Sequence, residues 1–151
     1  MRLLAGIAAL IAVAVLVAVA AEDKDKKKDK DDVIVINIKG KGGKSKFIKE
    51  GDDDQKDVTV TVGQTVKWVN VSNAPHTATC DVKANDKPIF RTPEMDPDDK
   101  DKKSASVTFD KQKYDDAGGK DGKPVDLPYH CEIHPSMKSK IILKPADKKD
   151  K

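Results

Sequence analysis

Between residues 33 and 144 the apolar residues occur in short runs rich in β-branched side chains. In "DVTVTVG" (57–63), Val58 and Val60 fall on one face of an extended strand, while Thr59 and Thr61 fall on the other. Runs of the same kind are "VIVINIKG" (33–40), "TVKWVNV" (65–71), "HTATCDV" (76–82), "SASVTF" (104–109), "LPYHC" (127–131) and "SKIILK" (139–144). None of them has helical spacing, and only residues 110–118 form a weakly helical window. The pattern predicts a chain built of strands.

Gly, Pro, Asn and Asp residues separate these runs, as is usual for turns between short strands. About seven or eight such strands predict an all-β protein, a Greek-key antiparallel β-sandwich. Two connections, residues 83–103 and 110–126, are long and rich in Pro and charge. We expect both to be surface loops.

The N-terminal segment differs from the rest of the chain. A single Arg precedes an apolar run from Leu3 to Ala21, and charged residues follow at once. Ala18, Val19 and Ala20 match the small-x-small pattern of a signal-peptidase site. The run of about 19 residues is also close to the minimum that spans a bilayer. Residues 1–21 are therefore predicted to be a signal peptide or an N-terminal membrane anchor, and the remainder to be periplasmic or extracellular.

Charged tracts border the predicted strands on both sides. Residues 22–32, "EDKDKKKDKDD", contain no apolar side chain, and residues 145–151 are similarly polar. They predict a disordered spacer and a charged tail on either side of one domain, residues 33–144. The chain has 29 Lys and Arg against 26 Asp and Glu, in short blocks of either sign. This balance argues against a nucleic-acid-binding surface.

The segment "YHCEIHPSM" concentrates residues that bind metals. Cys131, His134 and Met137 have the spacing Cys-x2-His-x2-Met, which can direct a thiolate, an imidazole and a thioether at one point. Thiolate and imidazole favour copper or zinc, and a thioether favours copper. The one histidine outside this segment is His76. Two His, one Cys and a weakly held Met describe a mononuclear electron-transfer copper site.

Two segments also resemble a known family. "VGQTVKWVNVSNAPHT" and "YHCEIHPSMKSKIIL" are similar to the ligand-bearing segments of the small blue copper proteins, the cupredoxin family that includes plastocyanin, amicyanin and pseudoazurin. The resemblance covers about residues 33–144. It implies that His76, Cys131 and His134 surround one copper ion, Cu(II) or Cu(I), with Met137 at a longer axial distance. It also implies a core position for Trp68 and an exposed edge of His134 through which electrons pass.

The chain departs from the family at two positions beside these residues. Thr77 follows His76 where the family often has Asn, whose side chain steadies the ligand loop. Glu132 follows Cys131 where small or polar residues are usual. Hydrogen bonds and charges around metal ligands tune potential and rigidity, so both departures leave the redox potential open.

The two cysteines raise an alternative, because exported proteins usually oxidise such a pair to a disulfide. Cys80 lies four residues beyond His76, about 13 Å along a strand. If His76 meets Cys131, Cys80 is too distant to form a bond that requires Cα atoms within about 7 Å. We expect Cys80 to be a small buried residue.

His130 suggests a second alternative, because copper nitrite reductases have a histidine directly before the blue-copper cysteine. Such a second copper needs three histidines, and His130 is the one left after two are used. We expect His130 to be a surface or packing residue.

The sequence therefore predicts an electron carrier and not an enzyme. Its partners would be redox proteins such as a c-type cytochrome or a dehydrogenase. Two other functions remain open: a copper-buffering protein without electron transfer, and a cupredoxin subunit of a multicopper reductase.

Overall fold

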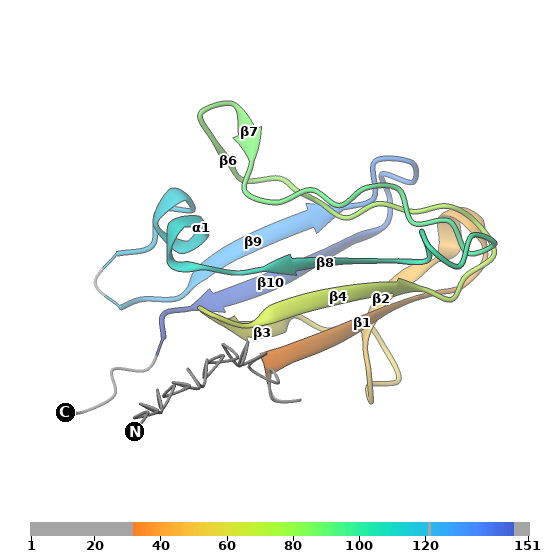
Figure 1. The fold of residues 1–151 in the computed structure, drawn as a ribbon, viewed down its shortest axis with the longest axis horizontal. Coiled ribbons are helices and arrows are strands. Elements are labelled where there is room, and N and C mark those ends of the chain that lie inside the picture. The colour runs from red at the N-terminus through yellow and green to blue at the C-terminus, as the bar shows by residue number, and fades with distance from the viewer. Residues whose placement is uncertain (1–31, 121, 147–151) are drawn as a thin grey trace, which may run out of the picture.

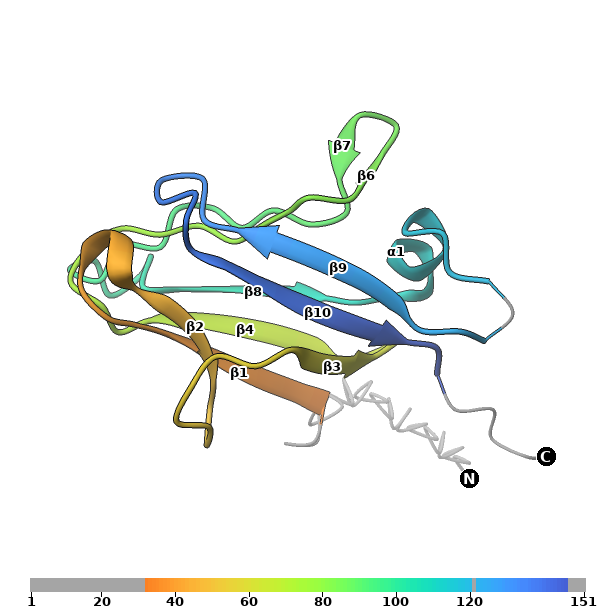
Figure 2. The same ribbon diagram turned by 180° about the vertical axis from the view of Figure 1, so that it is seen from behind.

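The computed structural model describes residues 32–120 and 122–146, and this part of the chain contains two four-stranded sheets (Figures 1 and 2). The first sheet has the order β2-β1-β4-β8, with strands β2 (Lys46–Lys49), β1 (Val33–Lys39), β4 (Thr65–Asn70) and β8 (Ser104–Thr108). The second has the order β3-β10-β9-β5, with strands β3 (Val58–Thr61), β10 (Lys138–Lys144), β9 (Val125–His130) and β5 (Thr79–Cys80). The remaining elements are a hairpin of β6 (Lys83–Ala84) and β7 (Lys87–Pro88), the helix α1 (Lys111–Asp116) and a 3-10 turn at Gly42–Lys44.

The predicted β-sandwich is confirmed, although its sheets are not wholly antiparallel. Strand β1 runs parallel to β4, with Val33 opposite Thr65, and β10 runs parallel to β3, with Ile141 opposite Val58. Parallel neighbours need a long connection. The chain provides one by placing β2 in the first sheet and β3 in the second before β4 returns to the first.

Alternation along the strands builds the core between the sheets. In β3, Val58 and Val60 are buried while Thr59 is exposed, as the sequence pattern predicts. Trp68 of β4 is completely buried, which confirms its predicted place in the core. Its ring lies 5.5 Å from that of Phe90 and 6.0 Å from that of Tyr129, measured between centroids. The contact between Trp68 and Tyr129 joins the two sheets, and Phe90 packs beside both rings.

The prediction of a surface loop at residues 83–103 is wrong for part of that segment. Phe90, Thr92 and Met95 are buried. The segment runs along the chain that follows His76, because Cys80 N–H donates to the Phe90 carbonyl and Thr92 N–H donates to the Ala78 carbonyl. The short apolar stretch "IF" between Pro88 and Arg91 gives no periodic signal, so the sequence does not predict this strand-like pairing.

Two smaller differences concern strands β2 and β5. Strand β2 was not predicted, since Phe47 and Ile48 are two buried residues between lysines and too few to form a pattern. Strand β5 covers two residues of the longer run predicted at 76–82. The weakly helical window at 110–118 does contain α1, whose first turn is capped by the Asp110 carboxylate accepting from Lys113 N–H.

The predicted leader, residues 1–21, lies outside the described residues, as do residues 22–31 of the spacer and 147–151 of the tail. Within the part of the chain that the structure does describe, no helix is long and apolar enough to cross a membrane. The described residues therefore comprise the β-sandwich with its connections.

The burial of Phe90 gives a direct test of the corrected loop. Replacing Phe90 with Ala removes a core ring and should lower the free energy of unfolding by about 3–5 kcal/mol. Val71→Ala, at an apolar residue that is 48% exposed, should change it by less than about 0.5 kcal/mol. Denaturant unfolding of the metal-free protein measures both, and equal small effects would place Phe90 outside the core.

Candidate metal centre

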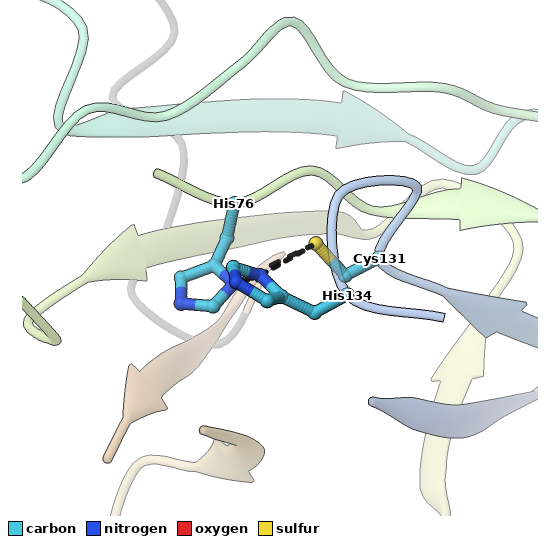
Figure 3. Close-up of side chains that lie close together, drawn as sticks. All are labelled: His76, Cys131 and His134. Carbon is cyan, nitrogen blue, oxygen red and sulfur yellow. Dashed lines mark hydrogen bonds between the residues drawn. The ribbon is translucent and has the colours of Figure 1, made fainter. Parts of the chain in front are cut away.

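Three predicted ligand residues lie close together (Figure 3), where the β9–β10 loop closes one end of the sandwich (Figure 1). His76 lies between β4 and β5, Cys131 follows β9 directly, and His134 lies in the β9–β10 loop. The Cys131 Sγ atom is 3.5 Å from His76 Nδ1 and 3.8 Å from His134 Nδ1, and the two Nδ1 atoms are 3.2 Å apart. Residues separated by 55 positions in sequence are thus brought together as the sequence predicted.

The spacing of these three atoms suits a metal ion. A triangle with these sides has its equidistant point about 2.0 Å from each corner, and metals such as zinc bind imidazole nitrogen at about 2.0–2.1 Å and thiolate sulfur at about 2.3 Å. Two imidazoles and a thiolate in a trigonal arrangement are the donors of blue-copper sites. The donor set and its geometry therefore fit a single copper ion.

Met137 lies in the same loop, held by the backbone. Met137 N–H donates to the His134 carbonyl at 2.8 Å, and Cys131 N–H donates to the Met137 carbonyl at 3.0 Å. These bonds close the loop from Cys131 to Met137 on itself, and the Met137 side chain is buried. Its role as an axial ligand stays a prediction.

A buried hydrogen-bond network positions His76. Its backbone pairs with Met95 in both directions, at 3.2 and 2.8 Å. The side-chain amide of Asn70 donates to the carbonyls of Ala74 and Met95, and its oxygen accepts from Ser72. The loop from β4 to His76 is therefore fixed without any contribution from a metal.

Neither Asn70 nor Met95 was singled out in the sequence. The signal for Asn70 was present in "NVSNAPH", since Asn side chains commonly bond the backbone two residues onward in turns. Met95 gave no signal, because its pairing with His76 is long-range and the intervening sequence reads as a loop.

Burial determines the charge state of His76. The residue is completely buried, and this burial, followed by the nearby charge of His134, lowers the pKa of His76 from 6.5 to about 4. The imidazole is therefore neutral at neutral pH. A neutral imidazole is the form that binds a metal.

Thr77 connects the two segments that carry the ligands. Its backbone N–H donates to Cys131 Sγ at 3.3 Å, and its hydroxyl oxygen lies 3.9 Å from the same sulfur. The hydroxyl also accepts from Glu132 N–H at 2.9 Å. Thr77 thus steadies the ligand loop at the position where the family often has Asn, and its N–H stabilises negative charge on the sulfur.

His134 is the most accessible of the three residues. It is partly exposed, whereas Cys131 and His76 are completely buried. The 3-10 turn lies against its ring, because a Cβ added at Gly43 would be 3.5 Å from His134 Cδ2. Gly42 N–H donates to Asn73 Oδ1, which ties this turn to the loop that precedes His76.

The remaining cysteine and histidine lie outside the cluster. Both cysteines are free, so Cys80 and Cys131 form no disulfide, and Cys80 is buried as predicted. Burial raises the pKa of the Cys80 thiol to about 11, which keeps it protonated. His130 Nδ1 hydrogen-bonds Asp81 Oδ1 at 2.5 Å, as expected for a surface or packing residue.

Comparison with known proteins shows a similarity of fold. No protein-family model matches the chain, and no curated protein sequence matches it. Among solved structures, the Cu(I) form of a Met→Ala variant of amicyanin has a TM-score of 0.51 and 24% identity, over 75% of this chain and 83% of that one. The oxidized state of a Pro→Ala variant of amicyanin gives the same values. A Met→Gln variant with Cu(I) is 23% identical, also with a TM-score of 0.51.

The hydroxyl of Thr77 can be tested by an isosteric replacement. In Thr77→Val the partly buried Glu132 N–H loses its acceptor, which should lower the free energy of unfolding of the metal-free protein by about 0.5–1.5 kcal/mol. Thr77→Ser should recover much of this loss. Thr59→Val, at an exposed strand residue, is the control, and a loss as large there would show that the hydrogen bond is not the cause.

The low pKa of His76 predicts a pH dependence of stability. In the unfolded chain His76 titrates near 6.5, but in the folded protein only near 4, so protonation between these values favours unfolding. Its contribution should be complete above pH 6.5 and lost as the pH falls towards 4. Urea unfolding of the metal-free protein at several pH values should show a steeper decline for the wild type than for His76→Gln. Parallel curves would contradict the assignment.

The fold and the group of His76, Cys131 and His134 lead to the same conclusion. Its fold is similar to that of the amicyanin structures, and three side chains that could hold a metal ion lie close together. The chain therefore has the cupredoxin fold, with a group of two histidines and one cysteine fit to hold one copper ion.

Proposed function

We propose that this protein is an exported type 1 copper protein that carries single electrons between redox partners. The convergence of His76, Cys131 and His134 on one point carries this proposal. The similarity to amicyanin, which has been solved in reduced and oxidized forms, supports a copper ion that changes its oxidation state.

The construction of the site suits electron transfer. Cu(II) and Cu(I) prefer different ligands and geometries, so a carrier works best when its ligands move little between the two states. Here Asn70, Thr77 and the backbone bonds of Met95 and Met137 hold the ligand segments in place. The protein alone supplies the arrangement of donors, and a bound copper supplies the one-electron redox change.

The burial of the site limits what can reach the proposed copper. The Cys131 sulfur and the His76 ring are covered by protein, while His134 presents part of its ring to solvent. An electron can pass through the edge of an imidazole, but a substrate molecule cannot reach the buried sulfur. This arrangement favours a carrier over an enzyme.

Such a carrier needs a donor and an acceptor. We infer that these are redox proteins such as a c-type cytochrome or a dehydrogenase, which would approach the exposed edge of His134. The apolar segment from Leu3 to Ala21 supports an exported protein, either secreted by cleavage or anchored by that segment.

The colour of the copper-loaded protein tests the proposed site. One equivalent of copper should give an intense visible band from thiolate-to-Cu(II) charge transfer. Cys131→Ser should abolish the band, while the matched control Cys80→Ser should keep it, because Cys80 lies outside the cluster. A colourless copper-loaded wild type, or a band that survives in Cys131→Ser, would overturn the assignment.

The rate of electron exchange tests the function beyond the site. A carrier should exchange electrons rapidly between its Cu(I) and Cu(II) forms and should be reduced or oxidised by a c-type cytochrome. A blue protein with sluggish exchange would instead be a copper buffer. More than one tightly bound copper per chain would indicate a multicopper reductase.

A further inference from the structure

An acidic residue directly follows the cysteine of the metal site in the sequence. Glu132 follows Cys131, and a full negative charge at that position would favour Cu(II) over Cu(I). The structure shows a counter-charge that the sequence did not reveal. Arg91 Nη2 lies 2.7 Å and Arg91 Nε 3.2 Å from the same carboxylate oxygen of Glu132.

The position of Arg91 is set by the backbone and does not depend on the ion pair. Arg91 forms a β-bridge with Thr79, and its neighbours Phe90 and Thr92 are both buried. Alternation along this stretch therefore turns Arg91 outward, on the side where Glu132 leaves the end of β9. The guanidinium is presented to the carboxylate by a paired segment.

The ion pair adds to hydrogen bonds that link Glu132 to the Cys131 sulfur through Thr77. Glu132 N–H donates to the Thr77 hydroxyl, and Thr77 N–H donates to Cys131 Sγ. Thr77 is two residues from Thr79, the bridge partner of Arg91. Arg91 thus holds the Glu132 side chain, and Thr77 holds the Glu132 backbone N–H. Arg91 and Thr77 lie on two segments that pair with each other through Thr79.

We propose that Arg91 is a positioning residue of the metal site, which holds the start of the ligand loop through Glu132 and compensates the negative charge that this residue introduces next to Cys131 in the chain. The inference rests on the proposed function, because it concerns the copper that the cluster would hold. It assigns a role to a residue 40 positions from Cys131 in the sequence, in a segment without any metal ligand.

Removal of the Arg91 charge and removal of the Glu132 charge should change the reduction potential of the copper in opposite directions. Without Arg91, the uncompensated carboxylate stabilises Cu(II), and the potential falls. Without the Glu132 charge, the uncompensated guanidinium favours Cu(I), and the potential rises. Because Arg91 is 63% exposed and Glu132 35% exposed, salt should reduce both shifts.

A double-mutant cycle tests the proposal on the full chain. Arg91→Met, Glu132→Gln and the double variant are loaded with copper, and their potentials are measured at low and at high salt. Arg91→Met should shift the ratio of Cu(II) to Cu(I) affinity by up to about tenfold, or about 59 mV for one electron. The double variant should return close to the wild-type potential.

The matched control is the exposed ion pair between Lys111 and Asp115 in α1, which lies at the other end of the sandwich from the β9–β10 loop (Figures 1 and 2). Lys111→Met also removes one positive charge, but it should leave the potential unchanged. Denaturant midpoints of the metal-free proteins form a second cycle. There, the losses in Arg91→Met and Glu132→Gln should be less than additive in the double variant.

The outcomes separate this inference from the proposed function. If the wild type is blue but Arg91→Met behaves like Lys111→Met, the role of Arg91 is wrong and the copper assignment stands. If both single variants shift the potential in the same direction, charge compensation is wrong. If the wild type shows no charge-transfer band, the proposed function fails, and the denaturant cycle alone decides whether Arg91 holds the loop.

Discussion

The site depends on the register between β5 and β9. Thr79 lies opposite His130, and Cys80 lies opposite Tyr129. Continuing this antiparallel register by two residues brings Thr77 opposite Glu132, where the hydroxyl of Thr77 accepts from Glu132 N–H. His76 and Cys131 then meet at the end of the ladder. A slip of one residue would turn one of the two ligand-bearing segments over, since side chains alternate between faces. The pairing of two short strands therefore determines whether a metal site exists.

Contacts around the paired strands β5 and β9 restrict the movement of the ligand-bearing segments. The backbone pairing of His76 with Met95, the amide of Asn70 and the closed loop from Cys131 to Met137 hold the ligand segments from three sides. Trp68, Phe90 and Tyr129 fill the core behind them. A site held by protein contacts retains its shape when one electron is added or removed. These contacts suit the proposed electron transfer, which needs ligands that move little between Cu(II) and Cu(I).

Most of the strands and the ligand residues could be predicted from the sequence, because local residue patterns indicate them. Alternating Val and Thr residues at 57–63 predicted a strand, and the spacing of Cys131, His134 and Met137 marked a ligand loop that needed His76. Contacts without a local pattern could not be predicted. The burial of Phe90, the pairing of Met95 with His76 and the position of Arg91 beside Glu132 all arise from one non-periodic segment that lies along another strand. Glu132 alone suggested an unbalanced charge, and only the fold revealed its partner.

We propose that the protein holds one copper ion by the same two histidines and one cysteine in both oxidation states. X-ray absorption spectroscopy of the copper-loaded protein at neutral pH, before and after reduction, tests this most directly. We expect one copper per chain, with two nitrogen ligands and one sulfur ligand at short distance, and almost unchanged bond lengths on reduction. Loss of the sulfur or of a nitrogen ligand on reduction, or a copper bound only by oxygen and nitrogen, would contradict it.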